Sequence, residues 1–477
     1  MPKEVKLQFQ IMCNSTSPGE ELYIVGNVDE LANWKIQNIQ ESQRLYCLEF
    51  PLWQSAPISF RNPSKFEYKF IIKKPSNNDN IRWELSPNKN RVLDASNFKS
   101  NLYLIESKEF DKEDNNDRKI VNLTEVNSNQ EEIHINNFKK KGLANIGATC
   151  YMNSTLQCFC HIKKLLKYFK EHEETRKNTL SYSFKLLIEE LYNDNNNCVY
   201  PYEFKDKISN MNNLFTGIAP NDAKDLVNFI IMQLHEELNK VKNNKNIINN
   251  NSNIRIDQKN KKLVLYYFFN DFKSKNKSII SDLFYGTNLS TTFCSRCQQA
   301  TFNYQTYFFL VFPLEQVRLY KININQINYN QVSIYDCFDY DSKTNYMTGS
   351  NIMYCNYCKI NTDSTTKSSL ITGPNVLILL LNRGKGIQFN VKVIFEEMLN
   401  LHNYIEYKNT GVKYSLFGVI THIGESGMGG HFIAYCRDPI NNQWNKFNDA
   451  IVTPVCDFKK EVIDFANPYL LFYQKSL

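Results

Sequence analysis

One cysteine of this chain occupies a setting in which a thiol becomes a nucleophile. Cys150 follows a glycine-containing turn and opens a run in which large apolar residues recur at helical spacing. We therefore expect Cys150 in the first turn of a helix that packs on a core. Unpaired N–H groups and the positive dipole end of a helix N-terminus stabilise a thiolate, so the pattern predicts a lowered pKa for this thiol. Taken alone, the helix favours a buried structural cysteine instead.

A histidine near the other end of the chain supplies the base that such a thiol needs. His431 follows two glycines, which allow close approach of a substrate backbone, and it opens an alternating strand. A turn then returns the chain in a second strand that ends near Asn448 and Asp449. Either side chain can reach one imidazole nitrogen and leave the other to face the thiolate. An isolated histidine is more often a satisfied core residue, but together with Cys150 it forms a constellation for nucleophilic catalysis.

The segments around these residues resemble the cysteine and histidine boxes of the ubiquitin-specific protease family. The first box of that family reads Gly-Leu-x-Asn-x-Gly-x-Thr-Cys-Tyr-Met-Asn-Ser-x-Leu-Gln, and residues 142–157 carry each of its defined positions. The resemblance implies a papain-like α+β cysteine protease, a thiol-dependent deubiquitinase whose partners are ubiquitin and ubiquitinated proteins. By position, it makes Cys150 the nucleophile and His431 the general base. It makes Asn145 the oxyanion-hole side chain and Asn448 the third member of the triad, with Asp449 as the alternative orienter.

Two CxxC pairs lie between these boxes, the first formed by Cys294 and Cys297 and the second by Cys355 and Cys358. Two such pairs can close one tetrahedral zinc site, because each tight knuckle supplies two thiolates. The gap between the pairs is far longer than in a compact zinc ribbon, so spacing alone leaves four unligated or redox-active cysteines as the alternative. In the resembled family, such pairs lie at the tips of a β-sheet called the fingers, which implies a structural zinc ion.

Other segments support the resemblance, and one departs from it. Apolar runs at 374–383, 414–422 and 469–473 predict central strands, in which His422 is an ordinary strand residue. Many family members carry Gln-Gln-Asp-Ala before a helix under the active site, whereas this chain reads Pro220-Asn221-Asp222-Ala223. Asp222 still suits the N-cap of that helix. The missing glutamines put the rate in doubt, and they leave an inactive scaffold that binds ubiquitin or a partner as the alternative function.

Composition divides the chain into two domains joined by a linker. Short alternating runs predict an all-β, immunoglobulin-like sandwich over residues 1–106, and a charged stretch at 107–140 predicts a solvated linker. The catalytic domain then covers 141–475 and contains an asparagine-rich low-complexity loop at about 243–253.

Three of the four tryptophans lie in the first domain. Trp53 suits the core, whereas Trp34 and Trp83 look like loop residues that offer a flat face to a sugar ring; the alternative places all three in the core. Nearby polar residues can bind the sugar hydroxyls. The segment resembles the starch-binding domain of carbohydrate-binding module family 20, which implies an α-glucan partner such as starch or glycogen. By position, the site then consists of these residues: Trp34, Lys69, Trp83, Glu84 and Asn88.

Bulk properties set the remaining expectations. The chain has 477 residues, a net charge of +7 without a basic stripe, and 13 cysteines. We therefore expect no nucleic-acid partner, and the lack of an apolar leader or membrane run predicts no membrane association. An odd cysteine count with two CxxC pairs predicts reduced thiols, hence a cytoplasmic or nuclear protein.

Overall fold

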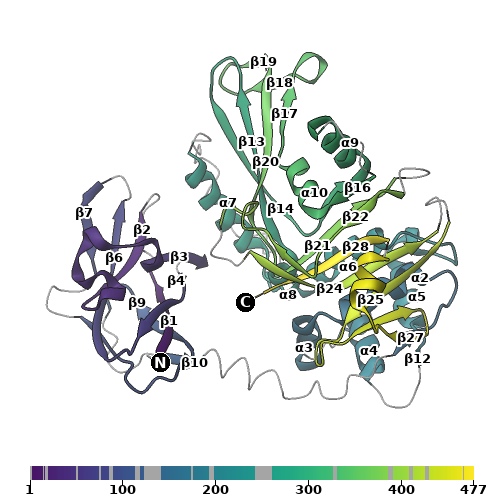
Figure 1. The fold of residues 1–477 in the computed structure, drawn as a ribbon, viewed down its shortest axis with the longest axis horizontal. Coiled ribbons are helices and arrows are strands. Elements are labelled where there is room, and N and C mark those ends of the chain that lie inside the picture. Colours follow the sequence, from purple (N-terminus) through teal and green to yellow (C-terminus); the bar gives the residue numbers. More distant parts are fainter. Residues whose placement is uncertain are drawn as a thin grey trace. The chain divides into compact units, whose positions relative to one another are not determined.

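The computed structural model describes most of the chain and divides it into two compact units (Figure 1). The first unit comprises residues 1–136 and 260–273, and the second comprises 137–259 and 274–477. The following residues lie outside the described part: 1–2, 14, 17–19, 50–51, 75–76, 85–89, 113–118, 123–140, 173–175, 193–197, 242–259, 326–329, 385–389, 408–411, 425–428, 466 and 477. The asparagine-rich stretch at 243–253 therefore receives no structural account. Helix α7 (Lys261–Lys275) interrupts the second unit in sequence but groups largely with the first.

The first unit is all-β, as predicted. Its strands pair in the order β10-β9-β1-β4-β3-β2-β6-β7, with β5 beside β1 and β8 beside β6. Alternate residues of β1 are buried, because successive side chains of a strand point to opposite faces. The strands are β1 (Glu4–Met12), β2 (Glu21–Gly26), β3 (Arg44–Glu49), β4 (Leu52–Ser55), β5 (Ile58–Arg61), β6 (Lys65–Lys74), β7 (Asn77–Trp83), β8 (Arg91–Asp94), β9 (Leu102–Glu109) and β10 (Lys119–Asn122).

The predicted linker at 107–140 begins too early. Strand β9 continues to Glu109, and β10 returns antiparallel to it, with Lys119 opposite Glu106. The mixed charges of this stretch suggested a solvated linker because a strand at the edge of a sheet also carries exposed polar side chains. The folded β-structure therefore extends to Asn122.

Helices form one layer of the second unit, and α2 lies at its centre. All eleven residues of α2 are buried, and it contacts α6 together with strands of the main sheet. The helix that begins at Cys150 ends at Cys160, and a second helix, α3, begins at Lys163, although the apolar residues of both share one core. The helices are α2 (Cys150–Cys160), α3 (Lys163–Glu171), α4 (Leu180–Tyr192), α5 (Tyr202–Met211), α6 (Ala223–Leu238) and α8 (Ile279–Phe284).

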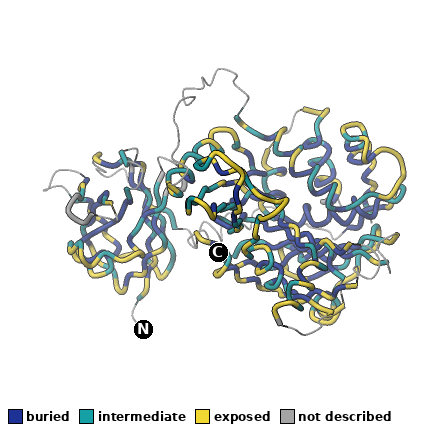
Figure 2. The backbone as a smooth tube through the Cα atoms, turned by 90° about the horizontal axis from the view of Figure 1, so that it is seen from above, coloured by how far each residue is buried: buried dark blue, intermediate teal, exposed yellow. Residues whose placement is uncertain are grey.

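The main sheet packs against these helices and carries the predicted central strands. Its order is β15-β21-β28-β24-β25-β26-β27, with β23 beside β24. The runs predicted at 374–383, 414–422 and 469–473 correspond to β21, β24 and β28, and buried segments run through the interior of the unit (Figure 2). The strands are β15 (Leu310–Pro313), β21 (Val376–Asn382), β23 (Met398–Asn400), β24 (Lys413–Ile423), β25 (His431–Arg437), β26 (Trp444–Asn448), β27 (Ile451–Pro454) and β28 (Pro468–Lys475).

A separate four-stranded sheet projects from the second unit as the predicted fingers, with β18 and β19 at its tip (Figure 1). Its strands are β13 (Gly286–Cys294), β14 (Ala300–Tyr307), β17 (Thr344–Met347) and β20 (Ser364–Thr372), and the tip hairpin is β18 (Met353–Cys355) and β19 (Ile360–Thr362). Helices α9 (Leu314–Asn325) and α10 (Ile334–Asp341) and the pair β16 (Gln331–Ser333) and β22 (Lys392–Ile394) complete the unit. Within the described ranges, every helix is too short or too polar to span a bilayer.

Candidate active site

Cys150 is the first residue of α2, as the sequence predicts, and a hydrogen-bonded loop holds it there. Asn145 Oδ1 accepts from the backbone N–H of Gly147 at 3.2 Å and of Thr149 at 3.1 Å. Thr149 Oγ1 in turn accepts from the N–H of Ile146 at 3.1 Å. Gly147 has a φ of +120°, a conformation in which glycine avoids the clash of a Cβ. The loop therefore fixes the thiol at the helix start, where Cys150 is 7% exposed.

The pKa of the Cys150 thiol is raised, which contradicts the prediction from the helix position. Burial is the main cause, and the nearby Asp449 carboxylate adds to the increase. Backbone hydrogen bonds, that with Phe432 first, act in the opposite direction but do not offset the burial. The helix N-terminus alone is thus insufficient, and a thiolate at this position needs a cationic partner.

His431 opens β25 and is oriented by the neighbouring strand β26. Its Nε2 lies 2.6 Å from Oδ1 of Asn448. A carboxamide oxygen only accepts hydrogen bonds, so the Nε2 atom carries the proton and donates it. In the neutral imidazole, the lone pair then resides on Nδ1. Asn448 thereby leaves Nδ1 as the basic nitrogen.

Asp449 connects the cysteine and histidine segments rather than orienting the imidazole. Its Oδ2 is 3.8 Å from His431 Nε2, beyond hydrogen-bond distance, but accepts from Nδ2 of Asn145 at 3.0 Å. Its Oδ1 accepts from Nδ2 of Asn153, a buried residue of α2, at 2.8 Å. Asn153 was not identified as a site residue from the sequence, although it lies within the cysteine box. One carboxylate thus joins the loop before Cys150, the helix after it and the hairpin of His431.

Backbone contact between the same segments explains the glycine that begins the cysteine box. The N–H of Leu143, in β11 (Gly142–Leu143), donates to the carbonyl of Asp449 at 2.9 Å. A Cβ on Gly142 would lie 2.3 Å from the carbonyl oxygen of Ala450. Only glycine allows this approach without a shift of backbone.

His422 is a residue of strand β24, as predicted, and lies opposite Phe432, the residue after His431. A Cβ on Gly430 would lie 2.3 Å from Cε1 of His422 and 2.4 Å from the backbone carbonyl oxygen of Ile423, so the glycine before His431 is required by packing. The His422 ring also meets Phe432 edge-on, with centroids 4.7 Å apart. Burial lowers the pKa of His422, the Asp222 carboxylate opposes this effect, and His431 strengthens it. His422 therefore belongs to the electrostatic surroundings of the candidate base.

Asp222 caps α6, which confirms the predicted helix start. Its Oδ1 accepts from the N–H of Lys224 at 2.9 Å. The hydroxyl of Tyr469, in β28, donates to both carboxylate oxygens at 2.8 Å. The sequence offered only a general signal for this contact, since a buried tyrosine hydroxyl usually has a partner. The helix that follows the altered Pro220-Asn221 pair is thus anchored to the main sheet.

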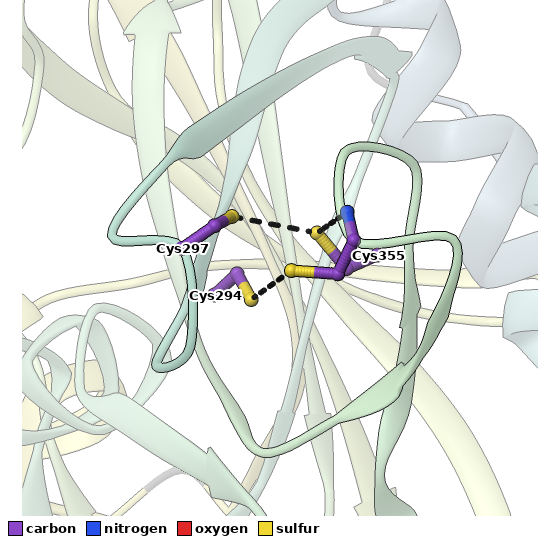
Figure 3. A group of neighbouring side chains, drawn as sticks. Cys294, Cys297 and Cys355 are labelled. Carbon is purple, nitrogen blue, oxygen red and sulfur yellow. Dashed lines mark hydrogen bonds between the residues drawn. The ribbon is translucent and has the colours of Figure 1, made fainter.

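The four predicted metal ligands converge at the tip of the fingers (Figure 3). The Sγ atoms of Cys294, Cys297, Cys355 and Cys358 all lie within 4.8 Å of one another. The Sγ atoms of Cys294 and Cys358 are 3.9 Å apart, and those of Cys297 and Cys355 are 3.7 Å apart. Four thiolates at about 2.3 Å from a tetrahedral zinc ion would be roughly 3.8 Å apart. The two shortest separations match this spacing, so the donor set fits a zinc ion.

The two knuckles share a backbone conformation. The residue after each pair, Gln298 and Lys359, has a positive φ of 58° and 60°, and each donates its N–H to the carbonyl of the first cysteine of its pair. A hydrogen bond with the hydroxyl of Thr362 is the main cause that lowers the pKa of Cys294 to about 6. Burial instead raises the pKa of Cys297 and that of Cys358, the latter to about 12, so a zinc ion that bound all four thiolates would have to displace protons from these two.

In the first unit, the two predicted sugar-binding tryptophans meet. The rings of Trp34 and Trp83 have centroids 6.3 Å apart and an interplanar angle of 45°. Trp34 is the last residue of the irregular 3-10 helix η1 (Asp29–Trp34) between β2 and β3, and Trp83 is the last residue of β7, so neither lies in a plain loop as predicted. Trp83 is 36% exposed. Trp53 packs against the core, as predicted, and its Nε1 donates to the carbonyl of Cys13 at 3.0 Å.

The polar residues predicted beside these rings have different positions. Glu84 is fully buried, accepts from the N–H of Phe70 at 2.8 Å, and forms a bidentate ion pair with Arg91 at 2.8 and 2.7 Å. Its carboxylate is therefore part of the interior and does not line the surface beside the rings. Lys69 is also almost entirely buried; burial lowers its pKa, and Glu84 opposes this effect. Asn88 lies outside the described residues.

Comparison with known proteins agrees with the two units. The model of the ubiquitin carboxyl-terminal hydrolase family matches residues 141–473, and that of the starch binding domain matches residues 4–101. Ubiquitin carboxyl-terminal hydrolase Usp2 of Drosophila melanogaster is 28% identical over 348 residues, which cover 70% of this chain and 35% of the fly protein. Ubiquitin carboxyl-terminal hydrolase 2 of Bos taurus is 27% identical over 349 residues, which cover 70% of this chain and 54% of the bovine protein.

The match therefore spans about half of these relatives or less. Among solved structures, a chain of the SAGA Ubp8/Sgf11/Sus1/Sgf73 DUB module bound to ubiquitin aldehyde has a TM-score of 0.53 at 21% identity, and the alignment covers 74% of each chain. This likeness shows the fold of the second unit.

Proposed function

Because the chain belongs to the ubiquitin carboxyl-terminal hydrolase family, we propose that it is a deubiquitinase that hydrolyses the amide bond after the C-terminal glycine of ubiquitin. The observation that carries this proposal is the local geometry of two side chains. Cys150 begins a buried helix, and His431 is held by Asn448 at 2.6 Å with Nδ1 as its basic nitrogen. A cysteine protease needs a thiol at a fixed position and an imidazole oriented by a third group, and these two features support the proposal.

The proposed reaction proceeds through an acyl-enzyme that water then hydrolyses. Nδ1 of His431 takes the proton of the Cys150 thiol, and the resulting imidazolium offsets the burial that raises the thiol pKa. The thiolate attacks the glycine carbonyl carbon, and a tetrahedral oxyanion forms. When the C–N bond breaks, the imidazolium gives its proton to the leaving amine. Water then attacks the thioester with His431 as base, which releases the ubiquitin carboxylate and restores the thiol.

Asn145 is proposed to stabilise the oxyanion. Its amide nitrogen carries two hydrogens, and the bond to Asp449 uses one of them. The second remains for the developing charge, while the Asp449 carboxylate fixes the orientation of the amide. Loss of one such donor costs on the order of 100- to 1,000-fold in kcat.

We propose that the four cysteines of the fingers hold a structural zinc ion. The ion would join the β13–β14 turn to the tip hairpin, and closed four-thiolate sites stabilise a fold directly. Purified protein is then expected to contain one zinc ion per chain by elemental analysis, and Cys355→Ser to contain none. Such thiolates and the Cys150 nucleophile need a reducing compartment, which supports a cytoplasmic or nuclear location.

We also propose that the first unit binds an α-glucan and directs the protease to starch or glycogen. The paired rings of Trp34 and Trp83 provide the apolar surface on which a sugar ring stacks. The match to the starch binding domain supports this assignment.

The protease proposal is tested with a ubiquitin whose C-terminus carries a thiol-reactive electrophile. Wild-type protein is expected to form a covalent adduct, and Cys150→Ala to form none. Cys158→Ala, which removes another buried cysteine of the same helix, serves as the matched control and should still react. An adduct on Cys150→Ala would overturn the assignment of the nucleophile.

A second candidate is an inactive scaffold that binds ubiquitin or a partner at a glucan surface. Pro220 and Asn221 in place of two glutamines favour it, as does the raised pKa of Cys150. Turnover of a ubiquitin amide substrate separates the two functions, because a scaffold would bind and release ubiquitin unchanged.

A further inference from the structure

A polar pocket opens beside Trp34 in the loop between β2 and β3. Its volume is about 500 Å³, within the range of small-ligand sites. We call it the loop pocket, and its lining residues are Asp29, Ala32, Asn33, Lys35, Gln37, Asn38, Ile39 and Gln40. The predicted sugar site does not include any of them.

Backbone hydrogen bonds fix the walls of the loop pocket. The N–H of Asn33 donates to Val28 at 2.9 Å, that of Lys35 to Ala32 at 2.8 Å, and that of Asn38 to Lys35 at 2.9 Å. The backbone of such a pocket is largely formed before a ligand arrives, so binding has to order only the side chains that line it.

The loop also stores backbone strain. Ala32, Asn33 and Trp34 have φ values of 64°, 48° and 60°, three successive non-glycine residues in the left-handed region. Each costs on the order of 1 kcal/mol and persists only where the surroundings impose it. This strain sets the path of the chain that bears Trp34 and the pocket wall.

The polar side chains of the pocket are available to a ligand. Those of Lys35, Gln37 and Asn38 are exposed and form no hydrogen bond with any other residue that the structure describes. Carboxamides both donate and accept hydrogen bonds, which suits the hydroxyl groups of a sugar. Asp29 and Lys35 carry opposite charges, so the lining does not select for a charged ligand of either sign.

The loop pocket adjoins Trp34 along the chain. Asn33 and Lys35, the residues on either side of Trp34, both line the pocket. Ile39 also lines it, and Ile39 and Trp34 each pack against the same small buried apolar cluster. A long chain that covers Trp34 therefore reaches the pocket with its further units.

From these observations, we infer that the loop pocket is an additional α-glucan subsite that binds the units of a long glucan beyond those that cover Trp34 and Trp83. The inference rests on the proposed glucan binding of the first unit. It makes the affinity of the protein depend on the length of the glucan chain.

The test measures binding of maltotriose and maltoheptaose to the full-length chain by calorimetry. Wild type is expected to bind maltoheptaose more tightly than maltotriose. The double variant Gln37→Ala with Asn38→Ala should bind maltotriose like wild type and lose about tenfold in affinity for maltoheptaose, because two hydrogen-bonding amides are removed. Asn97→Ala, an exposed amide between β8 and β9, is the matched control.

If the double variant keeps the wild-type difference in affinity between maltoheptaose and maltotriose, the loop pocket is not a glucan subsite. The tryptophan site would be unaffected by that result. Equal loss of affinity for both sugars would also overturn the inference, because the amides would then serve the tryptophan site itself. If wild type binds neither sugar, glucan binding by the first unit fails, and the inference fails with it. Thermal unfolding shows whether each variant is folded.

Discussion

The candidate active site and the tryptophan site are built in opposite ways. In the active site, contacts join segments far apart in the chain: Asn145 and Asp449, separated by 304 positions, share a hydrogen bond. In the first unit, Trp34 is presented by a short loop whose backbone bonds run between residues a few positions apart. A site assembled from distant segments depends on the whole fold, whereas a local site depends on one loop and the strand beside it.

The largest expected effect comes from loss of the residue that orients the base. Asn448→Ala should lower kcat/KM for a ubiquitin amide by about 100- to 10,000-fold, because His431 then lacks its fixed tautomer and orientation. The measurement is steady-state turnover, with thermal unfolding to establish that the variant is folded.

Asp449→Asn provides the comparison for this variant. It removes the charge 3.8 Å from the imidazole but leaves Asn448 in place. If Asn448→Ala retained full activity while Asp449→Asn lost it, Asp449 would be the orienter and the geometry described above would not be the working one.

The next prediction concerns the contribution of contacts between distant segments to the stability of the fold. Gly142→Ala places a Cβ 2.3 Å from the carbonyl oxygen of Ala450, so the two segments must separate. We expect a loss of about 1–3 kcal/mol in the free energy of unfolding, typical of overpacking. Chemical denaturation of the full chain measures it.

Gly429 is the matched glycine, because a Cβ there meets no atom of the described residues within 4 Å. Gly429→Ala should change the free energy of unfolding by less than about 0.5 kcal/mol. Equal destabilisation by both substitutions would mean that the contact between Gly142 and Ala450 is not the cause.

Removal of the two tryptophans should abolish glucan binding without affecting catalysis. Trp34→Ala combined with Trp83→Ala is expected to abolish co-sedimentation with amylose, since the stacking surface is removed. Turnover of a soluble ubiquitin amide should remain within about twofold of wild type, because the altered residues lie in the other unit. Co-sedimentation equal to that of wild type would refute the glucan site.

The two sites also differ in how much of each the sequence predicts. Short sequence motifs were enough to predict three features of the second unit. These are the helix start at Cys150, the strand of His431 and the two cysteine pairs. The contacts of Asp449 were not predicted, since they depend on how distant segments meet in the folded chain. Glu84 was misplaced for a different reason: its partner Arg91 is only seven positions away, at the start of β8, but their ion pair buries a carboxylate that its sequence context suggested to be exposed.

Strand β10 and the position of Trp83 were predicted wrongly because both depend on strand pairing. The ten-stranded order of the first unit includes β10, which composition assigned to a linker. Trp83 ends a strand because β7 pairs with β6, where Trp83 lies opposite Ile71. Composition reports local preference, whereas strand pairing is decided by the rest of the sheet.

The smallest expected effect concerns the carboxylate of Asp449, whose hydrogen bonds connect the active-site segments. Asp449 raises the pKa of the Cys150 thiol, because a negative charge disfavours the thiolate. Asp449→Asn removes that charge, so the pKa of Cys150 should fall and the rate of alkylation by iodoacetamide should rise at a lower pH than in wild type. The measurement is the pH dependence of alkylation at Cys150 in the absence of ubiquitin. A shift toward higher pH would mean that loss of the bonds to Asn145 and Asn153 outweighs the charge, and the active site would then depend more on its long-range contacts than on its electrostatics.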